Sequence, residues 1–371
     1  MSYISPVSGH LLPPNDPAFT SEAIERASRY HRPRYIALLA DTVISLGVLA
    51  AAAMWVHPRI GAWWLGCGVL PISLVAVISI ARLPLAYDIG FRREHVWGFS
   101  AQSRWAWGVD FLRNFLLSAA FSAVPIWALA ALVHWSPRWW VAVAAPGAAT
   151  LVVVFGVLAP LVMEPLFNRF TPLADSELAN RLRSLAERTG TPISNVLVAD
   201  ASKRSGKVNA YVSGVGPTRR LVLYDTLLAK ADAAEVELVV ANELGHRRAR
   251  HVAKGTALAA AGAALTTLVI WVAVDNPGDP ASVPVIMLLG FALELVALPW
   301  QTALSRQWER EADRASLDLT GRPDVFRTAH MRLAEANLSD LNPPRWLYRL
   351  LFTHPTPPER LAAGAAWRPS S

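Results

Sequence analysis

The chain has 371 residues, of which 53% are hydrophobic and only 17% are charged, and it contains 15 tryptophans. This composition argues against a soluble protein and favours an integral membrane protein, because tryptophan is common in spans and at membrane interfaces. The net charge of +7 fits basic cytoplasmic loops, and no basic run is interleaved with aromatic residues as a nucleic-acid surface requires. The single cysteine, Cys67, excludes a disulfide framework and a thiolate metal site.

The first half of the chain predicts a tail followed by four membrane spans. Residues 1–34 are polar and lack the apolar stretch of a signal peptide, so we expect a cytoplasmic tail. Residues 35–167 form a four-span region, with apolar stretches at about residues 35–56, 60–80, 107–133 and 139–163. Each is long enough to cross a hydrocarbon core of about 30 Å. Asp41 lies inside the first stretch, and an intramembrane carboxylate is either a functional candidate or an interfacial residue.

Residues 168–253 form the one long polar region, and we expect the chemistry to lie there. Residues 175–190 predict a helix with a capping aspartate and a glycine stop. Residues 196–198 predict a short strand, and residues 208–213 with 221–224 predict a hairpin. Together these elements predict a small α+β unit that caps the membrane bundle.

A helical stretch at the end of this unit, Ala241–His246, carries the strongest chemical pattern. Asn242 and His246 fall about 40° apart on one helix face, with Glu243 between them. A zinc-peptidase helix has the pattern H-E-x-x-H, in which two imidazoles bind zinc and the glutamate acts as general base. Here Asn242 occupies the first histidine position. The alternative interpretation is a basic surface helix with a solvated histidine, and we expect the following run of Arg247, Arg248, Arg250 and His251 to face solvent or headgroups.

Two further spans, within residues 254–304, separate this helix from the polar residues 305–371. Glu309 and Asp313 lie one helical turn apart just after the second span. A carboxylate is an acceptable third zinc ligand, and a second carboxylate one turn on can accept a hydrogen bond from a metal-bound imidazole. The alternative is an acid-rich helix start just outside a membrane span.

Basic residues predict the orientation of the chain. With a cytoplasmic N-terminus, the polar region 168–253 and the C-terminal part are also cytoplasmic, and the outer loops hold only Arg59 and Arg138. This distribution follows the positive-inside rule. We therefore predict an integral protein of a bacterial plasma membrane whose termini and metal segment face the cytoplasm.

Taken together, the motifs resemble those of the type-1 CAAX prenyl endopeptidase family, related to the HtpX-like heat-shock proteases. Besides the two metal segments, the stretches that carry the resemblance are residues 82–87, 94–100, 165–168, 209–211, 223–228, 354–355 and 359–360, and together they cover roughly residues 35–365. The resemblance implies an α-helical membrane protein with a zincin-like unit. The family typically has seven spans, whereas this sequence predicts six, so an N-terminal span is expected to be missing.

The resemblance also implies the site. One zinc ion would be held by His246 and Glu309, with Asn242 at a degenerate ligand position and Asp313 orienting His246. Glu243 would be the general base, and His354 and Arg360 would stabilise the oxyanion. Asn209 and Ala210 would bind the substrate peptide at a sheet edge.

Three functions follow as hypotheses. The first is a zinc-dependent metalloendopeptidase that acts on peptides or proteins, such as C-terminally lipidated or damaged membrane proteins, within the lipid bilayer and without nucleic acid. The second is an impaired pseudopeptidase that keeps a binding or chaperone-like role, because an amide is a poor zinc ligand beside an imidazole. The third is a transporter, against which the spans show few charges and no paired repeats with broken helices.

Overall fold

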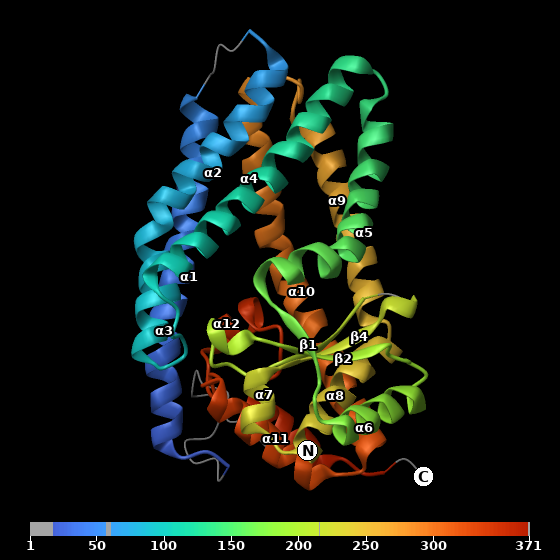
Figure 1. Cartoon of the computed structure of the whole chain (residues 1–371). Helices are drawn as coiled ribbons and strands as arrows, with labels where there is room; N and C mark the ends of the chain where they lie inside the picture. Colours follow the sequence, from blue (N-terminus) through green and yellow to red (C-terminus); the bar gives the residue numbers. More distant parts are fainter. Residues whose placement is uncertain (1–17, 57–60, 215, 370–371) are drawn as a thin grey trace, which may run out of the picture.

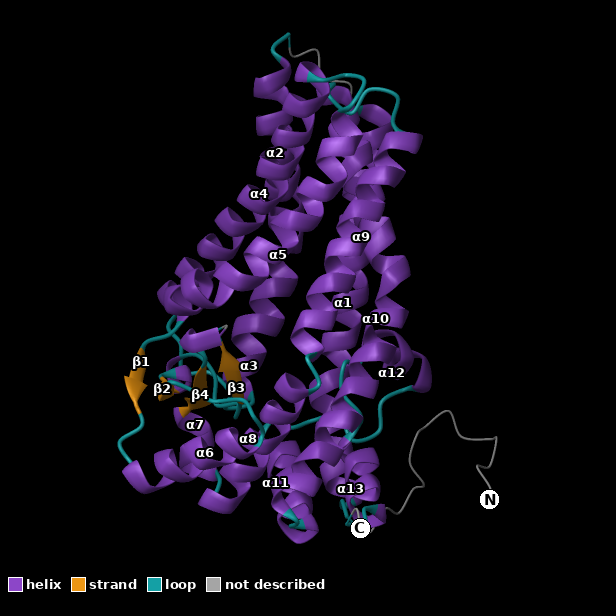
Figure 2. Ribbon diagram, turned by 90° about the vertical axis from the view of Figure 1, so that its right-hand side faces the viewer, coloured by secondary structure: helices purple, strands orange, loops and turns teal. Residues whose placement is uncertain are grey.

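The computed structural model describes residues 18–56, 61–214 and 216–369, and in this part of the chain six helical segments are long and apolar enough to cross a membrane. They contain α1 (Ser21–Trp55), α2 (Trp63–Tyr87), α4 (Arg104–Trp135), α5 (Trp140–Phe167), α9 (His251–Ala273) and α10 (Val283–Thr320). The prediction of six spans is confirmed. The six helices form a bundle at one end of the molecule, and the remaining elements form a unit at the other end (Figures 1 and 2).

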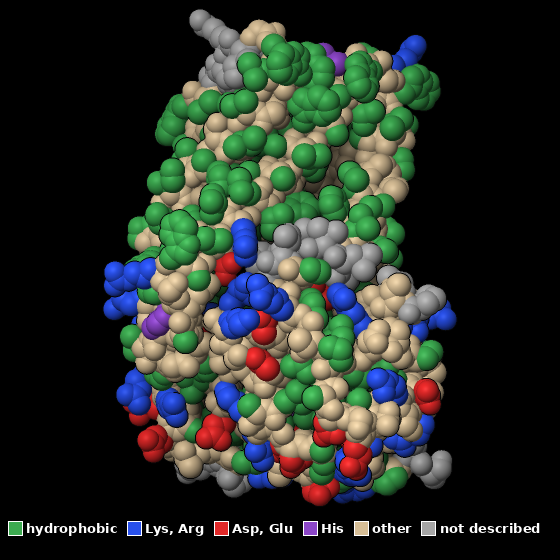
Figure 3. Space-filling view, in the orientation of Figure 1, with side chains coloured by type: hydrophobic (Ala, Val, Ile, Leu, Met, Phe, Trp, Pro, Cys, Tyr) green, Lys and Arg blue, Asp and Glu red, His purple; other side chains and the backbone are tan. Residues whose placement is uncertain are grey.

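The surface changes character between these two ends. Hydrophobic side chains cover the bundle, whereas Lys, Arg, Asp and Glu gather on the other half, which we call the polar half (Figure 3). Large apolar side chains such as Val43, Leu265 and Val296 are exposed on the spans. Exposed apolar side chains on single long helices are expected where lipid, rather than water, is the solvent. Asp41, the one carboxylate of the first span, pairs with Arg82 of α2.

A four-stranded sheet lies in the polar half, in the order β1-β2-β4-β3. Its strands are β1 (Phe170–Pro172), β2 (Asn195–Ala199), β3 (Ala210–Ser213) and β4 (Arg220–Tyr224). β2 and β4 pair in parallel and the other two pairs are antiparallel, so the predicted β3–β4 hairpin and the predicted strand β2 are confirmed. β1 has only three residues, too few to show an alternating pattern.

Helices pack on this sheet through a leucine- and valine-rich core. They are α6 (Ser176–Arg188), α7 (Asp225–Lys230) and α8 (Ala233–Arg248). The helix predicted at residues 175–190 is confirmed as α6, with Asp175 as its N-cap. The core includes Leu182, Leu221, Val236 and Leu244, all fully buried. α8 therefore presents one face to the sheet and leaves another for the site.

The N-terminal end of the chain differs from the prediction, and the segment after residue 304 is helical as its spacing suggested. α1 begins at Ser21 and is capped by Thr20, so the expected tail over residues 1–34 is wrong from there on; residues 1–17, like Arg59, lie outside the described part. The reason is Tyr30, which is fully buried against Phe99 and Leu338. α10 continues unbroken to Thr320, so the polar residues 305–320 extend the helix of the last span into the polar half.

Three helices complete the polar half. After α10 come α11 (Pro323–Ala336), α12 (Arg345–Leu351) and α13 (Pro357–Ala366). α11 packs on α8 and on α13, and α13 also contacts α10. The four-residue helix α3 (Arg93–Val96) continues α2 through a π-helical turn at Asp88–Arg92. α10 and α11 thus pack on α8, while α12 and α13 pack on α10.

Candidate active site

The site is built where α8 crosses α10. A Cβ atom added at Gly245 would lie 3.0 Å from the Ala315 Cβ and 3.3 Å from the Ala312 backbone, so only glycine lets the two helices approach this closely. The start of α8 is fixed by a capping box between Asp232 and Glu235. The close crossing brings side chains from segments more than 60 residues apart into one site.

His246 and Glu309 meet across this crossing. The His246 Nε2 atom lies 3.2 Å from the Glu309 Oε1 atom, and the His354 Nε2 atom lies 3.3 Å from the same oxygen. Burial lowers the pKa of His246, but the hydrogen bond and charge of Glu309 outweigh this effect and leave the pKa raised. The sequence placed all three residues at the site, and the structure brings them together around one carboxylate oxygen.

The other side of the His246 ring is held by His251, which the sequence did not suggest. His251 Nε2 lies 3.0 Å from the carboxylate of Glu311, which can only accept, so this nitrogen carries a proton. In neutral His251 the Nδ1 atom is then an acceptor, and it lies 3.1 Å from His246 Nδ1. Neutral His246 therefore carries its proton on Nδ1 and presents a bare Nε2 to Glu309.

The expectation that His251 faces solvent or headgroups is wrong, because the backbone turns at Arg250. In a continuous helix His251 would be rotated about 140° from His246. Arg250 instead has φ = 57°, a left-handed conformation that ends α8 and starts α9 in a new direction. His251 is consequently 3% exposed and stacks on Trp308, with ring centroids 5.1 Å apart.

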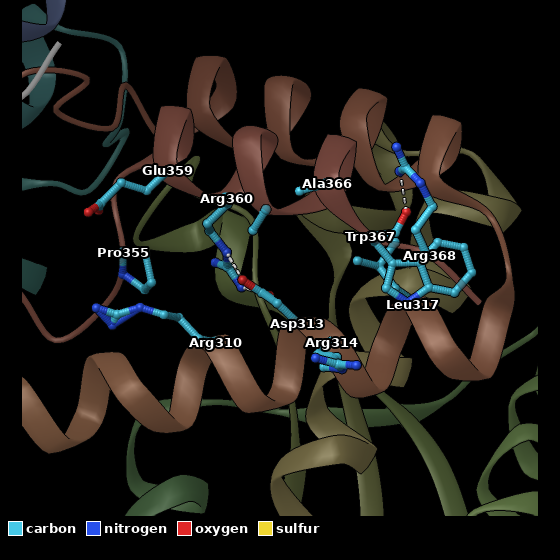
Figure 4. Close-up of a pocket in the computed structure, with 11 residues that line it drawn as sticks. Arg310, Asp313, Arg314, Leu317, Pro355, Glu359, Arg360, Ala366, Trp367 and Arg368 are labelled. Atoms are coloured by element: carbon cyan, nitrogen blue, oxygen red, sulfur yellow. Dashed lines mark hydrogen bonds and ion pairs between the residues drawn. The ribbon is translucent and has the colours of Figure 1, made fainter. Parts of the chain in front are cut away.

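Asp313 occupies a different place from the one expected. It accepts a 2.8 Å hydrogen bond from the Asn242 amide nitrogen and a bidentate pair from Arg360, whose Nε–Oδ2 distance is 2.7 Å. The pairing of Arg360 on α13 with Asp313 on α10 is visible in Figure 4. The Asp313 oxygens are thus paired with Asn242 and Arg360, and the side chain next to His246 Nδ1 is His251.

Glu243 has the electrostatics of a proton carrier. Burial raises its pKa to about 7, although the nearby His246 acts in the opposite direction. A carboxyl group with a pKa near neutrality can both accept and donate a proton at physiological pH. Its position on α8 is one residue after Asn242, on the side that opens to the cavity.

A cavity of about 410 Å³ lies beside this site, and the residues that line it do not include His246, His251 or Asp313. Among its lining residues are Asn209, Asn242, Glu243, Glu309, His330, His354 and Arg360. Ala210 begins β3, which is an edge strand of the described sheet; the residue is only 2% exposed, whereas its neighbour Asn209 is exposed. A second cavity of about 420 Å³ lies behind the Arg360–Asp313 pair and is lined by Arg310, Arg314 and Arg368 (Figure 4).

The donor set fits zinc in part. Bonds of 2.0–2.1 Å in a tetrahedral site place two ligand atoms about 3.3 Å apart, close to the 3.2 Å between His246 Nε2 and Glu309 Oε1. Two facing acceptors at that distance need a shared proton or a cation between them. Asn242 is a poor third donor, because it offers a neutral amide oxygen in place of an imidazole nitrogen, and its amide nitrogen donates to Asp313. Among the described residues, no three His, Cys, Asp or Glu side chains converge as a ready metal site.

A six-span bundle that holds an E-x-x-H helix against an acidic helix, with Glu243 and Glu309 lining one cavity, fits an integral-membrane metallopeptidase. The chain belongs to peptidase family M48, whose model matches residues 172–368. A second model, the CAAX prenyl protease N-terminal region of five membrane helices, matches residues 13–169.

Individual relatives agree with this assignment. The chain is 27% identical over 342 residues to the uncharacterized metalloprotease YhfN of Bacillus subtilis, covering 85% of this chain and 77% of the relative. It is 30% identical over 312 residues to a CAAX prenyl protease 1 homolog of Oryza sativa, covering 77% and 70%. The crystal structure of Ste24p from S. mikatae superposes with a TM-score of 0.78 at 23% identity, over 95% of this chain and 91% of that one. The predicted family, a membrane hydrolase with a peptidase unit, is confirmed.

Proposed function

We propose that this protein is a zinc-dependent metalloendopeptidase of a bacterial plasma membrane, with its active site facing the cytoplasm. The observation that carries the proposal is that Glu243, whose pKa is raised, lines one cavity together with Glu309 and His354. Glu309 in turn pairs with His246. Glu243 is suited to carry a proton, His246 and Glu309 to donate to zinc, and His354 to donate a hydrogen bond, and metal-assisted peptide hydrolysis requires these groups.

In the proposed reaction, zinc held by His246 and Glu309 would polarise the scissile carbonyl and lower the pKa of the attacking water. Glu243 accepts a proton from that water on its carboxylate and later delivers it to the leaving amine nitrogen. His354, whose side chain is 59% exposed at the mouth of the cavity, donates to the developing oxyanion. Arg360 lies 3.5 Å from Glu309 and adds positive charge to the same wall.

We infer that the substrate is an extended peptide. β3 is an edge strand whose first residue, Ala210, follows Asn209 at the cavity wall. A peptide added to such an edge is held by backbone hydrogen bonds, which tolerate varied side chains. The names of the relatives make C-terminally prenylated peptides the first substrates to test, and damaged membrane proteins the second.

The cytoplasmic orientation rests on charge. Basic side chains gather on the polar half (Figure 3), whereas Arg138 lies in the loop before α5, at the opposite end of the bundle. The connection between α9 and α10 holds Asp275 and Asp279 instead of basic residues. This asymmetry is the one that the positive-inside rule associates with a cytoplasmic polar half.

The test is cleavage of a peptide by the purified, zinc-supplied protein in detergent, beside Glu243→Gln and Asn242→His. We expect the parent to cleave, a chelator to stop it, and Glu243→Gln to lower the rate at least about 100-fold with unchanged thermal stability of the fold. Equal rates in parent and Glu243→Gln would remove the mechanism. A silent parent beside an active Asn242→His would show that the family site has lost a ligand that nothing else replaces.

A further inference from the structure

A second cavity of the polar half has no part in the proposed reaction. It has a volume of about 420 Å³ and lies between α10 and α13, beside the Arg360–Asp313 pair (Figure 4). Sites for small molecules have volumes of about 300–1,000 Å³, so this cavity is large enough for one. Four arginines and two carboxylates line it: Arg310, Arg314, Arg360, Arg368, Asp313 and Glu359. Its wall therefore carries a net charge of +2.

Both carboxylates of this wall already have partners. Asp313 is paired bidentately with Arg360. Glu359 accepts a 2.7 Å hydrogen bond from the Tyr348 hydroxyl group and a 2.8 Å hydrogen bond from the Thr356 backbone N–H group. Neither carboxylate is engaged with the other three arginines of the wall.

These three arginines have no acidic partner among the described residues. Arg310 donates a 3.3 Å hydrogen bond to the Arg306 carbonyl, and Arg368 donates a 2.7 Å hydrogen bond to the Trp367 carbonyl. The Arg314 side chain makes no hydrogen bond or ion pair with any residue that the structure describes. Arg310 and Arg314 lie one turn apart on α10, and like charges at this spacing repel each other. An anion bound in the cavity would offset this repulsion and accept hydrogen bonds from the free guanidinium groups.

The rest of the wall is apolar. Leu317, Ala363, Ala366 and Trp367 line the cavity. The Trp367 indole N–H donates a 2.7 Å hydrogen bond to Asp318, so the ring is held in place. An aromatic ring held near guanidinium groups suits a ligand that has both an anionic group and an apolar part.

We propose that this cavity binds a small phosphate-bearing molecule, with Arg314 as the principal donor to its phosphate group. Guanidinium groups match phosphate oxygens in geometry and charge. A phosphate monoester carries about −1.5 to −2 charges at neutral pH, which balances the +2 charge of the wall, whereas a carboxylate balances only half of it. The ligand comes from solution rather than from lipid, because α13 lies at the end of the polar half farthest from the membrane bundle (Figure 2).

The experiment is isothermal titration calorimetry on the full chain in a phosphate-free detergent, at neutral pH and fixed ionic strength and with excess chelator. Binding needs neither zinc nor peptide cleavage, so its outcome is separate from that of the metallopeptidase proposal. The probes are phenyl phosphate, inorganic phosphate and benzoate, which keeps the ring but has a single charge. The variants are Arg314→Gln and, as the matched control, Arg327→Gln. Arg327 is likewise exposed and without a side-chain partner among the described residues, but it lies on α11 outside the cavity.

We expect one phenyl phosphate per chain, bound more tightly than inorganic phosphate because its ring meets Trp367, and much more tightly than benzoate. Arg314→Gln should lower the affinity for phenyl phosphate at least about 10-fold, which is the effect of one lost hydrogen bond between charged groups. Arg327→Gln should bind like the parent. Because both arginines are exposed, both variants should unfold at the parent's temperature without ligand, and phenyl phosphate should raise that temperature less in Arg314→Gln than in the parent and the control.

Equal affinity in the parent and Arg314→Gln would overturn the inference. Equal losses in Arg314→Gln and Arg327→Gln would do the same, because anions would then be attracted by the basic chain as a whole. Benzoate that binds as tightly as phenyl phosphate would show that the cavity does not select phosphate. A parent that binds no probe would leave the cavity without this role, whatever its peptidase activity.

Discussion

Arg360 is the residue whose removal should be felt most strongly. Its guanidinium is buried between two carboxylates one turn apart on α10: it pairs bidentately with Asp313 and lies 3.5 Å from Glu309. Asp313 is 3% exposed and Glu309 8% exposed, so water cannot replace the arginine. Removing one partner of a buried ion pair costs about 3–5 kcal/mol, because the remaining charge is left uncompensated.

We therefore expect Arg360→Met to destabilise the polar half by about 3–5 kcal/mol. For a folding unit of this size, that corresponds to a fall in the unfolding temperature of about 6–20 °C. The measurement is thermal unfolding in detergent with excess chelator, followed by tryptophan fluorescence, so that loss of metal cannot cause the change. Arg310→Met is the control, since Arg310 is an exposed arginine on α10, the helix that carries Asp313 and Glu309.

A second substitution separates charge from packing. Asp313→Asn in the Arg360→Met background removes one of the two uncompensated carboxylates and should recover part of the lost stability. An Arg360→Met variant that unfolds within a degree or two of the parent would refute the reasoning, as would a double variant less stable than Arg360→Met.

Two further predictions concern the contacts that place the zinc donors. His251→Phe keeps an aromatic ring on Trp308 but removes the acceptor for His246 Nδ1. Zinc affinity should therefore fall about 10–100-fold, while the unfolding temperature of the metal-stripped protein stays near that of the parent. Unchanged zinc affinity in a competition titration would contradict this prediction. Gly245→Ala places a Cβ atom 3.0 Å from the Ala315 Cβ, so it should lower the stability of the fold by about 1–3 kcal/mol and slow peptide cleavage. Gly262→Ala on α9 is the control: it has open space around it and should change neither the stability nor the cleavage rate.

The membrane bundle could be predicted from the sequence because its cause is local. A stretch of about 20 apolar residues specifies a span whatever its neighbours are, and all six predicted stretches are helices in the structure. The strands β2, β3 and β4 were also predictable, since β-branched and apolar runs are bounded by turn residues. The position of α1 was not, because the burial of Tyr30 depends on Leu338, more than 300 residues away.

In the candidate site, too, residues placed by local spacing could be predicted from the sequence, whereas residues placed by distant contacts could not. The positions of Glu243, His246 and Glu309 follow from a spacing of three or four residues within single helices. His251 could not be placed, because one left-handed residue, Arg250, redirects the chain between two helical turns. His330 carries no pattern in the sequence at all, and its relation to Asn242 exists only through Asp313, which both side chains approach.

Asp313 explains how the fold accommodates an asparagine at position 242. A carboxylate buried to 3% exposure needs compensation, and a neutral amide alone would leave its charge unpaired. Arg360 supplies that charge through both carboxylate oxygens, and Asn242 then has only to add one neutral hydrogen bond. Asparagine at position 242 therefore leaves no buried group unsatisfied, and the two helices can keep the approach that Gly245 allows. What position 242 lacks is therefore an imidazole donor for a metal, whereas the packing of α8 against α10 does not depend on one.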